Sequence, residues 1–264
     1  MHENMQTYSQ TLLAVLLAHL LADFPLQTDA LLKAKNGGAK GFLTHGAIHF
    51  VTVIVALELF THDTIWSLYS LSLLLAYVAV HLALDYLKRV YMRVRNVPDS
   101  TGPFVVDQAL HIATAAALSW VLTRASWAGL DMAAYWTDGV RRRVLLLAVT
   151  YGAVVFAGGY LVRSMTRSLT EEMTAPAGED KDALRNAGLY IGWLERFLVL
   201  TALLVQSPAM IGLILTGKSI ARLGELKGPK FAEYFLIGTL LSVSLALSGG
   251  IVLMLILYGT VFPK

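Results

Sequence analysis

The chain has 264 residues, of which 56% are hydrophobic and 15% charged, and its mean hydropathy is +0.61. An average soluble domain carries roughly 25% charged residues, so this composition excludes an ordinary soluble domain. The net charge of +3 lies in short stretches between apolar runs and does not indicate nucleic acid, and the absence of cysteine excludes disulfides and thiolate metal ligands. Because apolar runs near 20 residues recur throughout, the sequence predicts an all-α, polytopic transmembrane helix bundle of about seven spans.

Four apolar runs in the first half of the chain predict four membrane spans, at about residues 10–26, 42–60, 65–87 and 104–122. The first span should stop at Phe24-Pro25, because proline disfavours continuation of a helix. It lacks the charged region and cleavage site of a signal peptide, so we expect it to be retained. The lysine-containing stretch between the first two spans is expected to be a polar loop, and residues 61–64 a tight turn.

The second half of the chain predicts a fifth span at about residues 144–162, a sixth at about 189–206 and a last one at about 234–258. Residues 208–223 are too short for a comfortable crossing, and whether they cross stays open. We therefore expect four parts: a four-helix metal-binding membrane unit at residues 1–125, an interfacial stretch and fifth span at 126–165, a polar linker at 166–186 and a C-terminal helical unit at 187–264.

Four pairs of ionisable residues recur at one spacing within the first 111 residues. On a helix, residues four apart leave the same face one turn apart. The first and third pairs end odd-numbered spans and the second and fourth begin even-numbered spans, so an up-down bundle brings all four into one leaflet. Four helices can converge such ligands on one site. The pairs are His19 and Asp23, His45 and His49, His81 and Asp85, and Asp107 and His111.

Imidazole and carboxylate ligands are typical of a borderline divalent metal, with zinc first and manganese or iron as alternatives. Five histidines and three aspartates exceed the ligands of one tetrahedral ion. Two ions bridged by an aspartate, or one ion with outer aspartates that orient histidines, would both fit. A single membrane histidine could simply join two helices, but eight residues at matched depth favour a function, either a metal site or a proton or ion relay.

Basic residues between the spans predict the orientation of the bundle. Most lie beside the paired residues, so the positive-inside rule predicts a cytoplasmic site with an external N-terminus. Arg124 and Arg141–Arg143 would lie on the opposite side and count against this orientation. Three further polar residues lie within a turn of the pairs: Gln27, Lys88 and Gln108. They could contact the substrate or its leaving group, or they could simply be the polar residues usual at the end of a span. Adjacent Glu195 and Arg196 could form a structural ion pair or a polar wall of the site, and we expect the structural ion pair.

The motifs His19-Leu-Leu-Ala-Asp23-Phe-Pro-Leu-Gln27, His45-x-x-x-His49, His81-x-x-x-Asp85-x-x-Lys88 and Asp107-Gln108-x-x-His111 resemble a bacterial membrane family known only as a domain of unknown function. The resemblance covers about the first 125 residues. The stretch from Glu233 to Gly238 looks like the C-terminal part of longer members. That family is itself distantly similar to predicted membrane-bound metal-dependent hydrolases. Those hydrolases are more distantly like zinc-dependent phospholipase C, which implies phosphoester chemistry.

The expected function is therefore a metal-dependent hydrolase in the bacterial cytoplasmic membrane. A divalent ion would activate water, Asp23 or Asp107 would act as general base, and Lys88 would contact the leaving group. The depth of the site suggests an amphipathic substrate such as a lipid phosphoester, with membrane lipid and a second copy of the chain as possible partners and no nucleic acid. A transporter of metal ions or of a proton-coupled solute is the alternative, followed by a di-iron oxidase.

Overall fold

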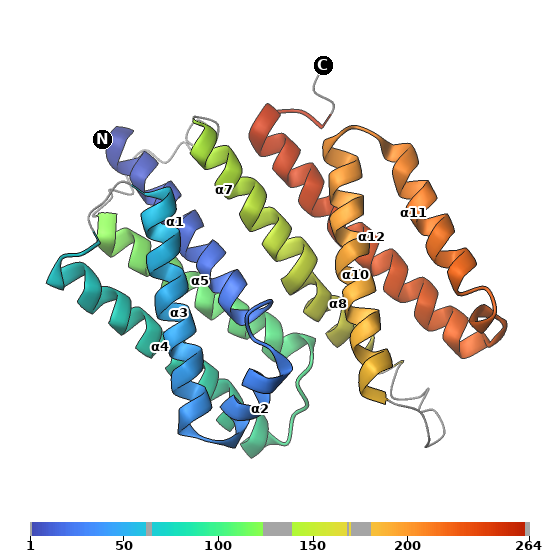
Figure 1. The fold of residues 1–264 in the computed structure, drawn as a ribbon, viewed down its shortest axis with the longest axis horizontal. Coiled ribbons are helices and arrows are strands. Elements are labelled where there is room, and N and C mark those ends of the chain that lie inside the picture. Colours follow the sequence, from blue (N-terminus) through green and yellow to red (C-terminus); the bar gives the residue numbers. More distant parts are fainter. Residues whose placement is uncertain (1, 62–64, 124–138, 168, 170–180, 262–264) are drawn as a thin grey trace. The chain divides into compact units, whose positions relative to one another are not determined.

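The computed structural model describes residues 2–61, 65–123, 139–167, 169 and 181–261 and is all-helical, with no β-strand in these residues (Figure 1). This confirms the predicted helix bundle. Five helices are long and apolar enough to cross a membrane, as expected of a membrane protein: Ala39–Phe60, Leu68–Arg95, Thr101–Thr123, Val140–Met165 and Pro229–Tyr258. The expected turn at 61–64, the interfacial stretch after residue 123 and the middle of the polar linker lie mainly outside the described residues.

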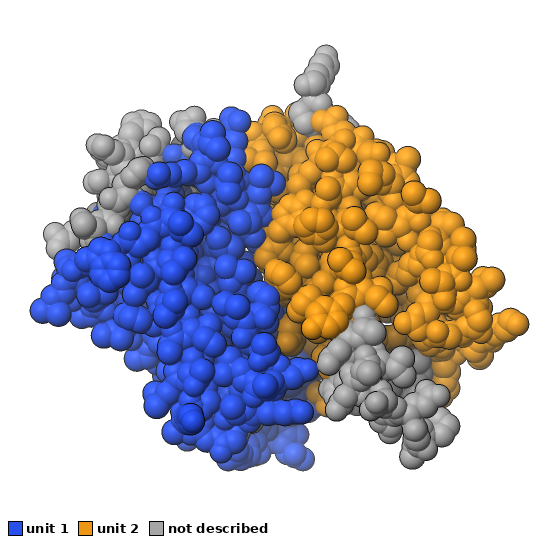
Figure 2. Space-filling model, viewed as in Figure 1, with its two compact units in different colours: residues 1–149 blue, residues 150–264 orange. Residues whose placement is uncertain are grey.

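The chain forms two compact units, residues 1–149 and 150–264, coloured blue and orange in Figure 2. The first contains α1 (His2–Asp23), α2 (Asp29–Gly37), α3 (Ala39–Phe60), α4 (Leu68–Arg95), α5 (Thr101–Thr123) and most of α7 (Val140–Tyr151). The second contains η1 (Gly152–Ala157), α8 (Gly158–Met165), α10 (Lys181–Leu204), α11 (Pro208–Ala221), η2 (Glu225–Lys227) and α12 (Pro229–Tyr258). The four-part division expected from the sequence stays a prediction.

In the first unit, α1, α3, α4 and α5 form a closed four-helix arrangement in which each helix packs against two others. Its apolar interior includes Leu13, Leu57 and Leu74, all of which are buried. Helix α1 ends at Asp23, just before Pro25, as the sequence predicted. Helix α4 is capped by Ser67, whose side chain accepts a hydrogen bond from the backbone amide of Ser70 (3.0 Å). The positions of these helix ends determine how deep within the bundle the paired residues lie.

The stretch between α1 and α3 is a helix, so the expected polar loop is wrong. Thr28 caps α2 by accepting from the backbone amide of Leu31 (3.3 Å), and Asp29 adds a favourable negative charge to the first turn. Helix α2 packs closely on α3 at Gly41, where a Cβ atom would lie 2.1 Å from the carbonyl carbon of Ala34. Because residue 41 has no side chain, α2 can fold back over the end of the bundle. The last turn of α2 then lies close to the paired residues.

The second unit is built around α10 and α12, with a core that includes Val199, Leu200 and Ala246. Residues 152–157 form a π-helical segment, which departs from the regular α-helical hydrogen-bond ladder. There the carbonyl of Val155 accepts from Arg196 Nε (3.1 Å) and Nη2 (2.9 Å). The neighbouring Glu195 contacts Lys218 of α11 (2.5 Å). Glu195 and Arg196 thus serve contacts between helices, as a structural role predicts, but each has a partner on another helix and the two do not form the expected ion pair with each other.

Candidate metal centre

The structure brings all eight paired residues together at one end of the four-helix arrangement. Each helix contributes two neighbouring turns, as the four-residue spacing requires. The histidines are no more than 2% exposed, and the aspartate side chains are between 8% and 12% exposed. The contributors are His19 and Asp23 on α1, His45 and His49 on α3, His81 and Asp85 on α4, and Asp107 and His111 on α5.

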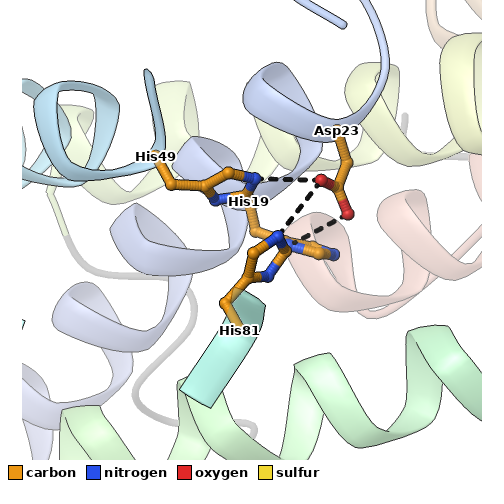
Figure 3. A group of neighbouring side chains, drawn as sticks. All are labelled: His19, Asp23, His49 and His81. Carbon is orange, nitrogen blue, oxygen red and sulfur yellow. Dashed lines mark hydrogen bonds and ion pairs between the residues drawn. The ribbon is translucent and has the colours of Figure 1, made fainter. Parts of the chain in front are cut away.

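Asp23 is the carboxylate that reaches the largest number of imidazoles. Figure 3 shows Asp23 with His19, His49 and His81. One possible metal-ligand atom from each of these four residues lies within 4.8 Å of the other three. Asp23 Oδ1 lies 2.9 Å from His49 Nε2 and 3.5 Å from His81 Nε2. Its other oxygen, Oδ2, lies 3.6 Å from His19 Nδ1. A single side chain at the end of α1 therefore joins donors from three helices.

His45, His81 and Asp85 form a second group with the spacing of metal ligands. His45 Nε2 lies 3.3 Å from His81 Nε2 and 3.4 Å from Asp85 Oδ2, and His81 Nε2 lies 3.5 Å from the same oxygen. Ligands bound to zinc at about 2.0–2.2 Å in a tetrahedron are roughly 3.3–3.6 Å from one another. The three edges of this triangle match that spacing. Asp23 Oδ1, 3.3 Å from His45 Nε2, joins the first group to the second.

The hydrogen-bond partners of two histidines determine which ring nitrogen is available as a ligand. His111 Nδ1 donates to the backbone carbonyl of Asp107 (2.8 Å), which leaves Nε2 with its lone pair. His19 Nε2 donates to Gln108 Oε1 (3.3 Å), which leaves Nδ1. Both available nitrogens are buried and have no hydrogen-bond partner among the described residues. Such outer partners are typical of metal-binding histidines.

The cluster concentrates ligand groups in a space that excludes water. The rings of His49 and His81 have centroids 3.7 Å apart, and those of His81 and His111 are 4.2 Å apart. Buried carboxylates and unpartnered ring nitrogens are costly unless a cation or hydrogen-bond partners compensate them. Neutral imidazoles and carboxylates suit zinc, manganese and iron. The clustered residues fit a metal ion and could hold one.

Two lysines border the acidic edge of the cluster. Lys88, singled out from the sequence, lies with its Nζ 3.3 Å from Asp107 Oδ2. Lys35, on α2, lies with its Nζ 2.6 Å from Asp85 Oδ2 and is only 6% exposed. Lys35 lies where the sequence predicted a polar loop, although the Thr28-Asp29 cap signal indicates a helix there. Gln108 contacts both His19 and Asp107 Oδ2 (3.3 Å), whereas Gln27 is half-buried beyond the end of α1.

Residues 11–137 match a family described as "Protein of unknown function (DUF3307)". The match includes all eight paired residues together with Lys35, Lys88 and Gln108. It agrees with the resemblance to a family of unknown function, whereas the likeness to metal-dependent hydrolases stays a prediction. No curated protein and no solved structure matches the chain.

Proposed function

We propose that this protein is a membrane-embedded metal-dependent hydrolase of the bacterial cytoplasmic membrane, acting on an amphipathic lipid phosphoester near the cytoplasmic interface. The observation that carries the proposal is the triangle of His45, His81 and Asp85, whose donor atoms lie 3.3–3.5 Å apart. Structural polar contacts between helices do not require three donor atoms to meet at this spacing. Zinc is the metal that we infer, because imidazole and carboxylate are among its usual ligands.

His45, His81 and Asp85 would hold the ion, and Asp23 would complete the set through the oxygen that already approaches His45 and His81. A bound divalent ion supplies positive charge that polarises the scissile group and lowers the pKa of water. His19, His49 and His111 surround these residues and could extend the set to a second ion. Their burial keeps bulk water away from the ligands, which strengthens the electrostatic interactions within the site.

Asp107 is better placed than Asp23 to act as general base. Asp23 Oδ1 is shared among histidines of α3 and α4, which fits a ligand. Asp107 Oδ2 instead faces Lys88 and Gln108, each at 3.3 Å. A carboxylate that is not shared among several imidazoles can take a proton from water. Lys88, which is 22% exposed, can place its charge beside a leaving-group oxygen.

An amphipathic substrate fits the apolar surroundings of the site. Val106 and Leu110 on α5 are 60% and 46% exposed and lie beside Asp107 and His111 in the sequence. On α4, Leu87 is 59% exposed next to Lys88. In a membrane, such side chains would face hydrocarbon. A lipid could therefore keep its tail in the bilayer while its polar head reaches the donors at the end of the bundle.

Metal content per protomer tests this proposal. We expect one or two zinc ions in the detergent-purified protein by elemental analysis, and loss of metal in His45→Ala and Asp85→Ala. Glu58→Gln is the matched control, because Glu58 is an exposed carboxylate on the same helix as His45. Zinc-loaded protein should then hydrolyse lipid phosphoesters, with inorganic phosphate released from a lipid phosphomonoester. Folded wild type without metal would overturn the proposal and favour proton-coupled transport, whereas iron as the only metal would favour oxidation chemistry.

A further inference from the structure

Lys35 is the most deeply buried lysine in the described part of the chain, at 6% exposed. An ammonium group held away from water beside a membrane bundle is costly, so it indicates a function. Three contacts fix it: the ammonium meets Asp85 (2.6 Å), the carbonyl of Lys35 accepts from Arg89 Nη1 (3.0 Å), and its backbone amide lies against Gly41 of α3. The chain thus builds a helix whose last turn delivers one positive charge to the edge of the metal centre.

Lys88 delivers a second positive charge to the same edge from a different helix. It contacts Asp107, and one carboxylate oxygen of Asp107 lies within 4.8 Å of one carboxylate oxygen of Asp85. Asp99, 3.7 Å from Lys88, is 64% exposed, so solvent screens its charge. An ammonium group has three N–H donors. Donors therefore remain on each lysine after its carboxylate contact, whereas Arg89 is committed to the Lys35 carbonyl and to the ring of Phe42.

The two lysines reverse the sign of the charge of the loaded site. The three aspartates contribute −3 and Lys35 and Lys88 contribute +2, so one divalent ion brings the set to +1. Without the lysines, the same aspartates and ion would carry −1 and would repel an anion. With the two lysines, the site attracts an anion. This electrostatic attraction is strong because water is largely excluded. A neutral ester would gain nothing from this arrangement.

We propose that Lys35 and Lys88 form an anion-binding edge that holds the phosphate group of the substrate beside the metal centre, with phosphate monoesters as the preferred class. This inference rests on the proposed hydrolase function and deepens it. The phosphate could belong to a lipid headgroup or be free inorganic phosphate, and the two sources share the same recognition chemistry. Lysine acts as a point charge and is a common phosphate-binding residue.

Calorimetric titration of the zinc-loaded, detergent-purified protein with inorganic phosphate tests the inference, with zinc content measured for every variant. We expect Lys35→Met and Lys88→Met to keep the metal and weaken phosphate binding about tenfold or more, as expected for the loss of a charged hydrogen bond. Lys35→Arg should restore most of the affinity. Lys33→Met, which removes an exposed lysine from the same helix, should bind as wild type does.

Micelles containing phosphatidic acid or phosphatidylcholine distinguish the two sources. Tighter binding of phosphatidic acid than of inorganic phosphate, with no binding of phosphatidylcholine, would support a lipid phosphomonoester. Unchanged phosphate affinity in metal-loaded Lys88→Met would overturn the inference, even if Lys35→Met lost metal because Asp85 had lost its partner. Lysine-dependent phosphate binding by a wild type that binds no metal would refute the hydrolase function and keep the anion site. Absence of both metal and phosphate binding would refute both.

Discussion

At the scale of single residues, two of the clustered histidines present one ring nitrogen to the site because another group holds the other nitrogen. The carbonyl of Asp107 accepts from His111 Nδ1, and the amide oxygen of Gln108 accepts from His19 Nε2. Gln108 also donates to Asp107 Oδ2 (3.3 Å), so one side chain orients residues of two helices. His19 and His111 are therefore oriented by partners that need not touch a bound metal themselves.

Gln108→Leu should lower metal affinity about 10–100-fold, the range found when an outer partner of a metal ligand is removed. The leucine keeps the volume but leaves His19 free to rotate and to expose either nitrogen. Competition with a fluorescent zinc chelator measures the change. Ile112→Leu is the control, because Ile112 is exposed on the same helix. Wild-type affinity in Gln108→Leu would show that His19 does not need this orientation.

The eight clustered residues could be predicted because their signal is local. A pair four residues apart is visible in the sequence, and the alternation of span ends places the four pairs at one level. Lys35 could not be recognised in this way, because its partner Asp85 lies 50 residues away and the ion pair exists only after α2 has folded back. The roles of the eight residues as ligands remain predictions that metal analysis must test.

At the scale of elements, α2 depends on one close approach between helices. A Cβ atom on residue 41 would lie 2.1 Å from the carbonyl carbon of Ala34 and 2.4 Å from the backbone nitrogen of Lys35. Backbone atoms cannot rotate away as the end of a side chain can, so the whole helix must shift. The sequence did not predict this helix, because its nine residues are too few to show a clear apolar period.

Gly41→Ala should destabilise the protein by about 1–3 kcal/mol, the usual cost of overpacking. It should also weaken phosphate binding as Lys35→Met does, because the shift moves Lys35 away from Asp85. Thermal unfolding in detergent and the phosphate titration measure the two effects. Gly102→Ala is the matched control, since a Cβ there meets nothing within 4 Å. Normal phosphate binding in a folded Gly41→Ala protein would separate α2 packing from the anion site.

The π-helical segment of the second unit was also absent from the sequence prediction, because hydrophobicity does not reveal a change in hydrogen-bond register. Arg196→Met removes both donors to the Val155 carbonyl and the hydrogen bond to Ser242 Oγ (3.2 Å). We expect a loss of about 1–3 kcal/mol, the cost of a buried acceptor left unpaired. Metal content should not change, because every candidate ligand lies in the first unit.

Arg222→Met is the control for this substitution. Arg222 pairs with Glu225 at the surface, where the two side chains are 36% and 51% exposed, and exposed ion pairs contribute about 0–1 kcal/mol. Unfolding midpoints in detergent should therefore fall for Arg196→Met and barely move for Arg222→Met. Equal shifts in both variants would show that the contact with the π-helical segment contributes no more than a surface pair.

At the scale of the whole molecule, the level of the site in the bilayer follows from where the helices begin and end. Helix α4 runs for 28 residues and carries its candidate ligands and Lys88 toward its C-terminal end, where Arg93 and Arg95 form a basic last turn. The positive-inside rule then predicts that this end is cytoplasmic. Arg141 and its two basic neighbours begin α7 after a helix that leads away from the site, so the rule is not obeyed everywhere.

Because the chain contains no cysteine, a single introduced cysteine reports this orientation without background. Leu68 and Val94 lie near opposite ends of α4 and are 86% and 75% exposed. At about 1.5 Å per residue the two positions are roughly 39 Å apart, enough to reach opposite faces of a bilayer. In intact cells, a membrane-impermeant maleimide should label Leu68→Cys, whereas Val94→Cys should react only after permeabilisation. The reverse pattern would place the metal centre at the external face, and its substrate would then have to come from the outer leaflet.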